Sequence, residues 1–181
     1  GDHRDLHSFP TRRSSDLNKI IKNIENTILK YGDSLSSIGV DTWGVDFGIL
    51  GKDGELLENP VSYRDGYNIV GFEKAQEKLS LKDIFMKTGN QIMSINTLFQ
   101  ILALKEENRN YKDIKTVLMM PDLINYFLTG KSYTEMTIAS TTQLFELENK
   151  KYSNDILESY GIDKSIFPEV KIGRASCRER V

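Results

Sequence analysis

The sequence predicts an α/β fold, in which helices alternate with short strands. Three observations indicate this class. Residues 18–31 carry apolar side chains at the spacing of an amphipathic helix, residues 45–50 alternate, and residues 116–120 form an uninterrupted apolar run. The first pattern is helical and the other two are typical of strands, so one chain of domain size contains both element types.

Each element is predicted from its own apolar period and from the glycine, proline or capping residue that bounds it. Gly89 and Gly130 end helices, Pro121 opens one, and Asn96 is predicted to cap a long helix. The run 116–120 has the composition of a buried parallel strand. In order, the predicted elements are a helix over 18–31, strands over 37–41 and 45–50, a hairpin turn at 52–54 with a return strand over 55–57, helices over 70–79, 81–88 and 97–107, a strand over 116–120, and helices over 123–128 and 155–160.

The two ends of the chain, residues 1–17 and 172–181, lack any apolar period. If residues 172–181 are reverse-translated with a permitted set of codons, the reverse complement encodes His-Ser-Phe-Pro-Thr-Arg-Arg-Ser-Ser-Asp, which is residues 7–16. One DNA sequence that flanks an insert in both orientations is typical of a ligated sequencing adapter, and not of basic tails or a transit peptide. We therefore expect both ends to be adapter-derived and residues 18–171 to be the native part.

Composition limits the chemistry of this native part. The two ends contain six of the 24 Lys and Arg residues and four of the 26 Asp and Glu residues, which leaves 18 basic against 22 acidic side chains. Both histidines (His3, His7) and the single cysteine (Cys177) also lie in the ends. Residues 18–171 therefore offer no disulfide, thiol nucleophile, histidine base or zinc site of these ligands.

The same composition limits the partners. Mild acidity without a basic block gives no reason to expect nucleic acid. No apolar run approaches membrane-spanning length and no signal peptide is visible, so we expect no membrane partner and a cytoplasmic protein.

Four carboxylates occupy predicted strand ends or helix starts, where α/β sheets gather ligands: Asp41, Asp46, Asp65 and Asp122. Each also has a structural interpretation. Asp46 fits a solvent-facing position of an alternating strand, and Asp122 fits the first turn of a helix. Asp65 fits either a local ion pair with Arg64 or one half of a polyol clamp.

The corner between the two predicted strands, Asp-Thr-Trp-Gly (41–44), contains the only tryptophan. Trp43 fits a core position and the wall of a ligand pocket equally well, and Gly44 lets backbone and ligand come close. The hydroxyl-rich run 134–142 is more often a loop that satisfies its own backbone than a site. No glycine-rich phosphate loop, metal motif or nucleophile elbow is present, so the residues alone support an α/β protein with a polar corner.

Seven blocks of the sequence, in their order along the chain, closely resemble the FGGY carbohydrate kinases, and the resemblance covers residues 18–171. The first and fifth blocks are similar to the branch of this family that acts on L-rhamnulose, and the last two are shared more widely. The blocks are Ser-Ile-Gly-Val-Asp-Thr-Trp-Gly-Val-Asp-Phe (37–47), Tyr-Arg-Asp (63–65), Thr-Gly (88–89), Asn-Thr-Leu (96–98), Leu-Met-Met-Pro-Asp (118–122), Tyr-Phe-Leu-Thr-Gly (126–130) and Thr-Ile-Ala-Ser-Thr-Thr-Gln (137–143).

The resemblance implies a partial actin-like, ribonuclease H-like ATPase domain, the family's N-terminal domain without its first strands. It implies phosphoryl transfer from ATP, with Mg²⁺, to the 1-hydroxyl of L-rhamnulose, so the partners are a ketose sugar and ATP. The family's sugar contact falls on Gly44. The other substrate-binding residues that it implies are Thr42, Trp43, Arg64, Asp65 and Asn96.

The resemblance also implies parts that the chain does not contain. The family's phosphate-binding loop would precede residue 18 and its His-Asp pair with the general base would follow residue 171. We therefore expect no catalytic residue or metal ligand here, no kinase activity from this polypeptide alone, and an open apolar sheet edge beside residues 38–41 that makes it unstable or prone to aggregate.

One departure and two alternatives accompany this prediction. Gly66-Tyr67 follows the Tyr-Arg-Asp block where the family usually has Ser-Arg, which affects the contacts of that rim. The alternatives are another FGGY kinase that acts on a different ketose or polyol, and a non-catalytic actin-like binding module.

Overall fold

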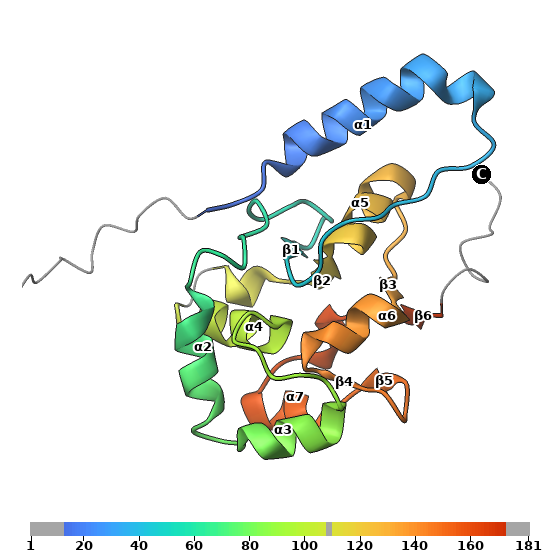
Figure 1. Cartoon of the computed structure of the whole chain (residues 1–181). Helices are drawn as coiled ribbons and strands as arrows, with labels where there is room; N and C mark the ends of the chain where they lie inside the picture. Colours follow the sequence, from blue (N-terminus) through green and yellow to red (C-terminus); the bar gives the residue numbers. More distant parts are fainter. Residues whose placement is uncertain (1–12, 108–109, 173–181) are drawn as a thin grey trace, which may run out of the picture.

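The structure, a computed structural model, describes residues 13–107 and 110–172. Helices and short strands alternate along these ranges, as predicted for an α/β protein (Figure 1). In chain order they are α1 (Leu17–Tyr31), η1 (Gly32–Ser34), β1 (Phe47–Leu50), α2 (Asn68–Ala75), α3 (Leu81–Thr88), α4 (Thr97–Glu106), η2 (Tyr111–Asp113), β2 (Thr116–Met119), α5 (Met120–Thr129), β3 (Thr134–Glu135), α6 (Met136–Ala139), η3 (Ser140–Thr142), β4 (Phe145–Glu146), β5 (Lys151–Tyr152), α7 (Asn154–Tyr160), η4 (Lys164–Ile166) and β6 (Val170–Lys171).

The strands of the described residues pair into three small sheets. β1 runs antiparallel to β2, with Phe47 opposite Met119 and Leu50 opposite Thr116. β3 pairs in parallel with β6, and β4 pairs antiparallel with β5. The prediction that 116–120 is a parallel strand is therefore wrong. A continuous apolar run reports burial on both faces, and burial does not fix the direction of the partner strand.

The hairpin after β1 is confirmed in a short form. The Gly51 amide donates to the Glu55 carbonyl, and the Leu57 amide donates to the Ile49 carbonyl. Gly54 has φ +79°, a left-handed conformation that glycine adopts without the strain of a Cβ. The turn that the Lys-Asp-Gly sequence predicts is therefore present.

The predicted strand over 37–41 is wrong, because these residues form no β-ladder with any described residue. Ile38 is 52 % exposed, and the segment connects the far end of α1 to β1 along the outside of the molecule (Figure 1). Alternating apolar residues favour a strand only where a neighbouring strand accepts their hydrogen bonds.

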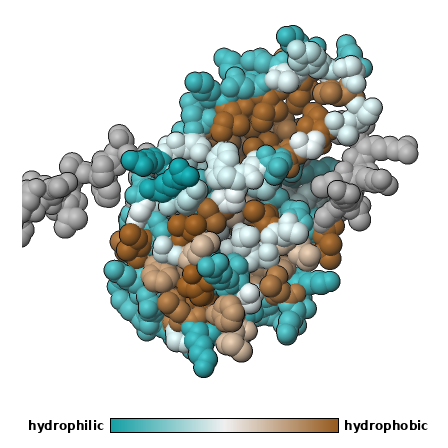
Figure 2. Space-filling model, viewed as in Figure 1, coloured by the Kyte–Doolittle hydropathy of each residue, from teal (hydrophilic) through white to brown (hydrophobic). Residues whose placement is uncertain are grey.

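Apolar side chains gather on this outer part of the molecule (Figure 2). Ile21 and Ile24 of α1 are only half-buried, although the helix is strongly amphipathic. Leu29, Leu35 and Ile38 are exposed. We call these five residues the α1 surface.

The core is built around α4. The predicted apolar face of this helix (Leu98, Ile101, Leu102 and Leu104) is buried, and so is every other residue of 97–104. α2 crosses α4 at Gly71, where a Cβ would collide with the Phe99 carbonyl oxygen of α4 and lie 2.7 Å from the Ala103 nitrogen. Only a glycine permits this approach of two helix backbones.

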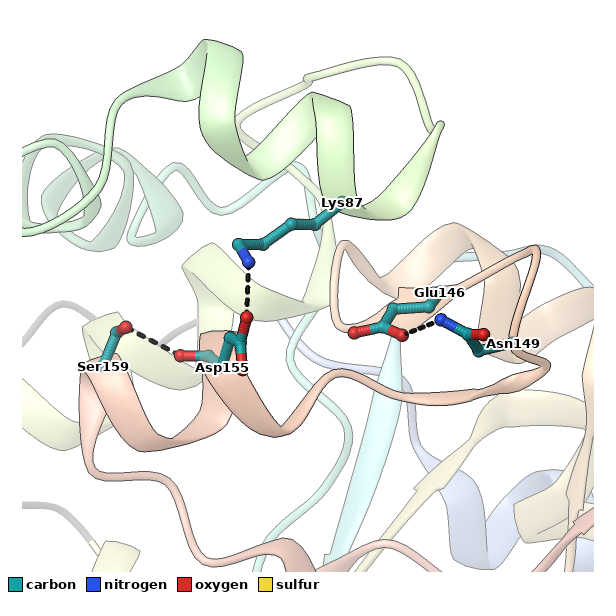
Figure 3. A network of polar contacts seen from close by, with 5 residues as sticks. All are labelled: Lys87, Glu146, Asn149, Asp155 and Ser159. Carbon is teal, nitrogen blue, oxygen red and sulfur yellow. Dashed lines mark hydrogen bonds and ion pairs between the residues drawn. The ribbon is translucent and has the colours of Figure 1, made fainter.

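A surface network joins α3 to α7 (Figure 3). Lys87 of α3 donates to Asp155 of α7 across 2.5 Å, and Ser159 donates to the Asp155 carbonyl oxygen. Asn149 donates to Glu146 beside them. The Lys87 and Asp155 side chains are 34 % and 69 % exposed, so water competes for both charges.

Residues 13–17, the described part of the predicted adapter tail, contact the body of the protein. The Ser62 amide donates to the Arg13 carbonyl and the Ser15 amide to the Pro60 carbonyl. The Asp16 side chain caps α1, and Leu17 is buried beside Leu50 and Leu118. Residues 1–12, with His3 and His7, and residues 173–181, with Cys177, lie outside the described residues.

No helix in the described part of the chain has both the length and the apolar character that a membrane span needs.

Candidate functional site

The Trp43 corner is organised around one buried carboxylate, Asp46, which is 1 % exposed. One of its oxygens accepts a hydrogen bond from the Trp43 indole nitrogen, and the other accepts from the Tyr63 amide, each at 2.8 Å. Its own carbonyl oxygen accepts from the Met120 amide, at the point where β2 passes into α5. Asp46 therefore fastens the corner to the Tyr-Arg-Asp segment and to the start of α5.

Burial raises the pKa of Asp46, while the hydrogen bonds from Trp43 and Tyr63 act in the opposite direction. Both carboxylate oxygens are already occupied by these donors. Asp46 is therefore suited to hold the corner together and not to accept a proton from a substrate.

A second buried side chain, Gln100 of α4, holds the other side of the corner. Its amide nitrogen donates to the Val45 carbonyl at 2.9 Å and to the Ile95 carbonyl at 2.6 Å. Its amide oxygen accepts from the Tyr67 hydroxyl at 2.6 Å. The corner is thus tied to the N-terminus of α4, where Asn96 lies.

Through Asp46 and Gln100 the fold brings together the three segments that hold the predicted substrate-binding residues. The segments are the corner, with Thr42, Trp43 and Gly44, the Tyr-Arg-Asp block, with Arg64 and Asp65, and the start of α4, with Asn96.

Gly44 is half-buried, and the space beside its backbone is largely open. A Cβ placed on it would meet only the Cδ1 atom of Ile138 in α6, at 3.8 Å, which is ordinary van der Waals contact. Its neighbour Trp43 is 41 % exposed. The interpretation of Trp43 as core filler is therefore wrong, because its indole reaches inward only to donate to Asp46 while its ring stays partly in solvent.

The Tyr-Arg-Asp block lies in the outer part of the site. Arg64 stacks on the Tyr63 ring, with its guanidinium carbon 5.4 Å from the ring centre, and donates to the Tyr63 hydroxyl. Asp65 accepts a hydrogen bond from the Arg13 amide. Arg64 is exposed and Asp65 is half-buried, so both side chains can reach a ligand at this rim.

Asn96 differs from its prediction in one respect. It stands at the N-terminus of α4, but its side chain makes no capping hydrogen bond and donates to the Gln91 carbonyl at 2.9 Å. At 1 % exposure it is also more buried than the other predicted substrate-binding residues. A cap would need the side-chain oxygen of Asn96 to accept from an α4 amide, whereas the contact observed uses its nitrogen as a donor to the preceding loop.

Two structural interpretations from the sequence are confirmed. Asp122 lies in the first turn of α5, and the hydroxyls of Ser140, Thr141 and Thr142 bond the carbonyls three residues before them. The interpretation of Asp46 as a solvent-facing residue is wrong, since its side chain is buried under the Trp43 indole. An alternating strand pattern cannot show that Asp46 faces inward, because the two donors that satisfy it there come from tertiary contacts.

The sequence prediction considered Asp46 as a ligand-gathering or solvent-facing carboxylate and not as a support of the corner, and it did not consider Gln100 at all. Gln100 could have been found, because it is the one amide within the apolar stretch 98–104 of a helix. A polar side chain in a fully buried stretch must have hydrogen-bond partners. Which backbone groups it serves is visible only in three dimensions.

The chemistry that this site offers is recognition by hydrogen bonds and ring contact. Among the described residues there is no group of three or more histidine, cysteine or acidic side chains that could hold a metal ion. Burial raises the pKa of Asp122 to about 7, but this carboxylate faces the Glu135 amide and not the corner.

Comparison with known proteins adds the decisive observation. The model of the N-terminal domain of the FGGY family of carbohydrate kinases matches residues 6–179. The chain belongs to the FGGY carbohydrate kinase family. The family's N-terminal domain is the α/β fold predicted from the sequence, of the actin-like and ribonuclease H-like class.

Curated relatives in this family include two rhamnulokinases. One, from Bacteroides thetaiotaomicron, is 41 % identical over 148 residues, which are 78 % of this chain and 30 % of the relative. Another, from Ligilactobacillus salivarius, is 34 % identical over 175 residues, which are 93 % of this chain and 36 % of the relative. The chain thus spans about a third of the length of the FGGY kinases that it matches.

Solved structures agree on the fold. A ligand-bound xylulose kinase from Lactobacillus acidophilus superposes with a TM-score of 0.79 at 20 % identity, over 92 % of this chain and 35 % of that one. A glycerol kinase from Plasmodium falciparum, crystallised with ADP, gives a TM-score of 0.73 at 23 % identity, over 94 % of this chain and 37 % of that one.

Proposed function

We propose that this chain forms the sugar-facing wall of a kinase that transfers the γ-phosphate of ATP to the 1-hydroxyl of L-rhamnulose. The observation that carries the proposal is the Gly44 corner, where an accessible backbone, a half-exposed tryptophan and the Arg64–Asp65 rim are tied together by one buried carboxylate. The rhamnulokinase relatives support the choice of sugar.

The residues of the corner suit a polyhydroxylated ligand. Gly44 has no side chain, so a sugar can approach the main chain closely. The exposed face of Trp43 offers a flat apolar surface, and Arg64 and Asp65 supply a charged donor and a charged acceptor for hydroxyl groups. Thr42 and Asn96 complete the proposed substrate-binding set.

We assign the rest of the reaction to the complete kinase of which this chain forms a part, which we call the parent enzyme. ATP is its phosphoryl donor, and Mg²⁺, when bound with ATP, would neutralise charge on the transferring phosphate. Because the described residues offer no metal cluster, and the sequence has no phosphate loop, we assign neither ligand a contact here. We place the parent enzyme in the cytoplasm, because ATP is its substrate.

Binding is the direct test of this proposal. The chain is titrated with L-rhamnulose while the Trp43 fluorescence and the backbone amide NMR shifts are followed. We expect saturable changes confined to residues 42–46 and 63–65, and smaller responses to D-xylulose and glycerol. A preference for one of those compounds would favour another FGGY specificity, and no response to any of them would contradict the proposal.

An assay of ADP formation distinguishes the activity of the chain from that of the parent enzyme. We expect no ADP formation when the purified chain is mixed with L-rhamnulose, ATP and Mg²⁺, because the proposed general base and phosphate loop lie in other parts of the parent. The complete gene product should produce ADP under the same conditions. ADP formation by the chain alone would show that these parts are not required, whereas an inactive complete product that still binds the sugar would indicate a non-catalytic binding module.

We also propose that residues 1–17 and 172–181 are adapter-derived and that 18–171 is native. The support is that a permitted set of codons for residues 172–181 encodes residues 7–16 when it is read on the opposite strand. Amplification of the gene from source DNA with primers inside residues 18–171 tests it. The flanking codons should differ from those of both ends, and recovery of the same ends from genomic DNA would contradict the proposal.

A further inference from the structure

The backbone at Val45 is held in a conformation that valine rarely adopts. Its φ is +66°, and the Asp46 amide donates to the Gly44 carbonyl at 2.9 Å across it. A hydrogen bond between residues i and i+2 around a central residue of positive φ is the strained form of the γ-turn. For a β-branched side chain this conformation is a genuine outlier.

Such a turn persists only where the surrounding contacts require it. Asp46, on one side of Val45, is fixed by Trp43, by Tyr63 and by the amide of Met120. The peptide group between Val45 and Asp46 is held as well, because its carbonyl oxygen accepts from the amide nitrogen of Gln100.

Gln100 is itself fixed in orientation. It is 0 % exposed, and its oxygen accepts from the Tyr67 hydroxyl while its nitrogen serves both the Val45 and the Ile95 carbonyls. A flipped amide would turn its oxygen toward the Val45 and Ile95 carbonyls and lose both of these hydrogen bonds. The side chain is therefore a rigid strut between α4 and the turn.

The turn leaves two hydrogen-bond donors at the corner. Within the described part of the chain, the Gly44 and Val45 amides have no acceptor, although both residues are half-buried. Half-buried donors of this kind are ready to bind an oxygen of a ligand. Strained backbone is also concentrated at sites that bind ligands or react.

We propose that Gln100 is a positioning residue that holds the strained Val45 turn, so that the Gly44 and Val45 amides together bind one oxygen of the ketose. This assignment rests on the proposed function and adds to it the second amide and the strut. Gln100 does not contact the sugar itself. Its effect passes through the Val45 carbonyl.

The strain is tested without any ligand by a double-mutant cycle of Val45→Gly and Gln100→Leu, with urea unfolding as the readout. Glycine adopts a positive φ freely, so Val45→Gly relieves strain while Gln100 is present. In the Gln100→Leu background the turn has already relaxed and the glycine brings no such relief. We expect Val45→Gly to be less destabilising in the wild type than in Gln100→Leu. Additive effects would contradict the role of the strut.

The structure supplies a matched control in Gln143, which is also 0 % exposed. Its nitrogen donates to the Asn90 and Gln91 carbonyls and its oxygen accepts from the Thr88 hydroxyl, so it has the same number and kind of contacts as Gln100. Within the part of the chain that the structure describes, it has no hydrogen bond to the corner, and its one link to the proposed substrate-binding set is the Gln91 carbonyl, which also accepts from Asn96. Gln143→Leu therefore carries a comparable loss of stability without the loss of the turn.

L-Rhamnulose is titrated into the wild type, Gln100→Leu and Gln143→Leu at a temperature where all three are folded by circular dichroism. We expect at least a tenfold loss of affinity and an altered Trp43 emission in Gln100→Leu alone. Equal affinity of the wild type and Gln100→Leu would overturn the positioning role and leave the proposed function intact. No binding by the wild type would overturn both.

Discussion

Gly44 and Gly71 lie in opposite surroundings, and only Gly71 is required by the packing of the fold. Gly71 lies where α2 presses on the backbone of α4, and an added Cβ would collide with the Phe99 carbonyl. At Gly44 an added Cβ would meet only a methyl group at 3.8 Å, so the fold itself has room for alanine. Packing therefore explains the glycine at position 71 but not the one at position 44, where the missing side chain leaves room for a ligand to approach the backbone.

The two buried carboxylates, Asp46 and Asp122, differ in the number of backbone and side-chain groups that donate to them. Asp46 at the corner receives one donor on each oxygen, from Trp43 and Tyr63. Asp122 in α5 shares one backbone amide, that of Glu135, between its two oxygens. Burial raises the pKa of both, and that of Asp122 reaches about 7. The carboxylate of Asp46 thus has more hydrogen-bond donors than that of Asp122.

The largest effect is expected from Gly71→Ala. The methyl group would force α2 away from α4, and we expect a loss of about 3 kcal/mol in the free energy of unfolding, as for overpacked cores. Urea unfolding followed by circular dichroism measures it. Gly39→Ala is the control, since a Cβ at Gly39 meets nothing within 4 Å. If the two variants unfold at the same urea concentration, the close crossing of α2 and α4 is refuted.

The next effect is a dependence on pH that Asp122 introduces. Its pKa is about 7 in the folded chain and 3.8 without burial, so the folded state binds the proton more tightly. The stabilisation that protonated Asp122 provides is complete below pH 3.8 and is lost as the pH rises to about 7. Asp122→Asn removes this loss and keeps an acceptor for the Glu135 amide.

We therefore expect the stability of Asp122→Asn relative to the wild type to increase between pH 4 and pH 8, by on the order of 3 kcal/mol. The remaining carboxylates titrate alike in both proteins, so the difference isolates Asp122. Parallel stability curves over this range would show that Asp122 is ionised in the folded chain at neutral pH.

The α1 surface gives a third, smaller effect, which appears as association and not as unfolding. Ile38 is 52 % exposed on a segment that forms no ladder with the described residues. We expect the chain to self-associate with rising concentration and Ile38→Lys to reduce this, because a charged side chain within an exposed apolar surface opposes association. Sedimentation velocity measures both. A monomeric wild type with a cooperative melt would contradict the expectation.

The smallest effect is expected from the Lys87–Asp155 pair of Figure 3. Each residue favours the charged form of the other: Asp155 raises the pKa of Lys87, and Lys87 lowers that of Asp155. Because both side chains reach solvent, we expect Lys87→Ala to shift the melting temperature only slightly, with less effect at high salt. A shift as large as that of Gly71→Ala would show that this surface pair is essential for the docking of α3 on α7.

The sequence predicted six helices from local signals, but it missed the short α6 and placed the end of α2 at residue 79 where the structure has Ala75. α3 begins and ends where predicted, and Gly89 and Gly130 adopt the left-handed conformation expected after a helix. The segment 37–41 was mispredicted because strand formation depends on a partner strand, which no local pattern supplies. The antiparallel direction of β2 was missed for the same reason.

The site was predictable in part. Thr42, Trp43 and Gly44 were indicated by the polar corner and by the family resemblance, and the structure gathers them with Arg64, Asp65 and Asn96. The supports behind them, Asp46 and Gln100, are tertiary contacts that join residues 17 and 55 positions apart. The strain at Val45 leaves no trace in composition, since valine is ordinary in a strand and exceptional only at positive φ.

The most direct test of the corner as a sugar site compares Gly44→Ala with Gly39→Ala in a titration with L-rhamnulose. Both alanines fit the free protein, so both variants should unfold like the wild type. We expect Gly44→Ala alone to lose affinity, by at least about tenfold, which corresponds to ~1.4 kcal/mol. Unchanged affinity in Gly44→Ala, with wild-type binding intact, would contradict the account.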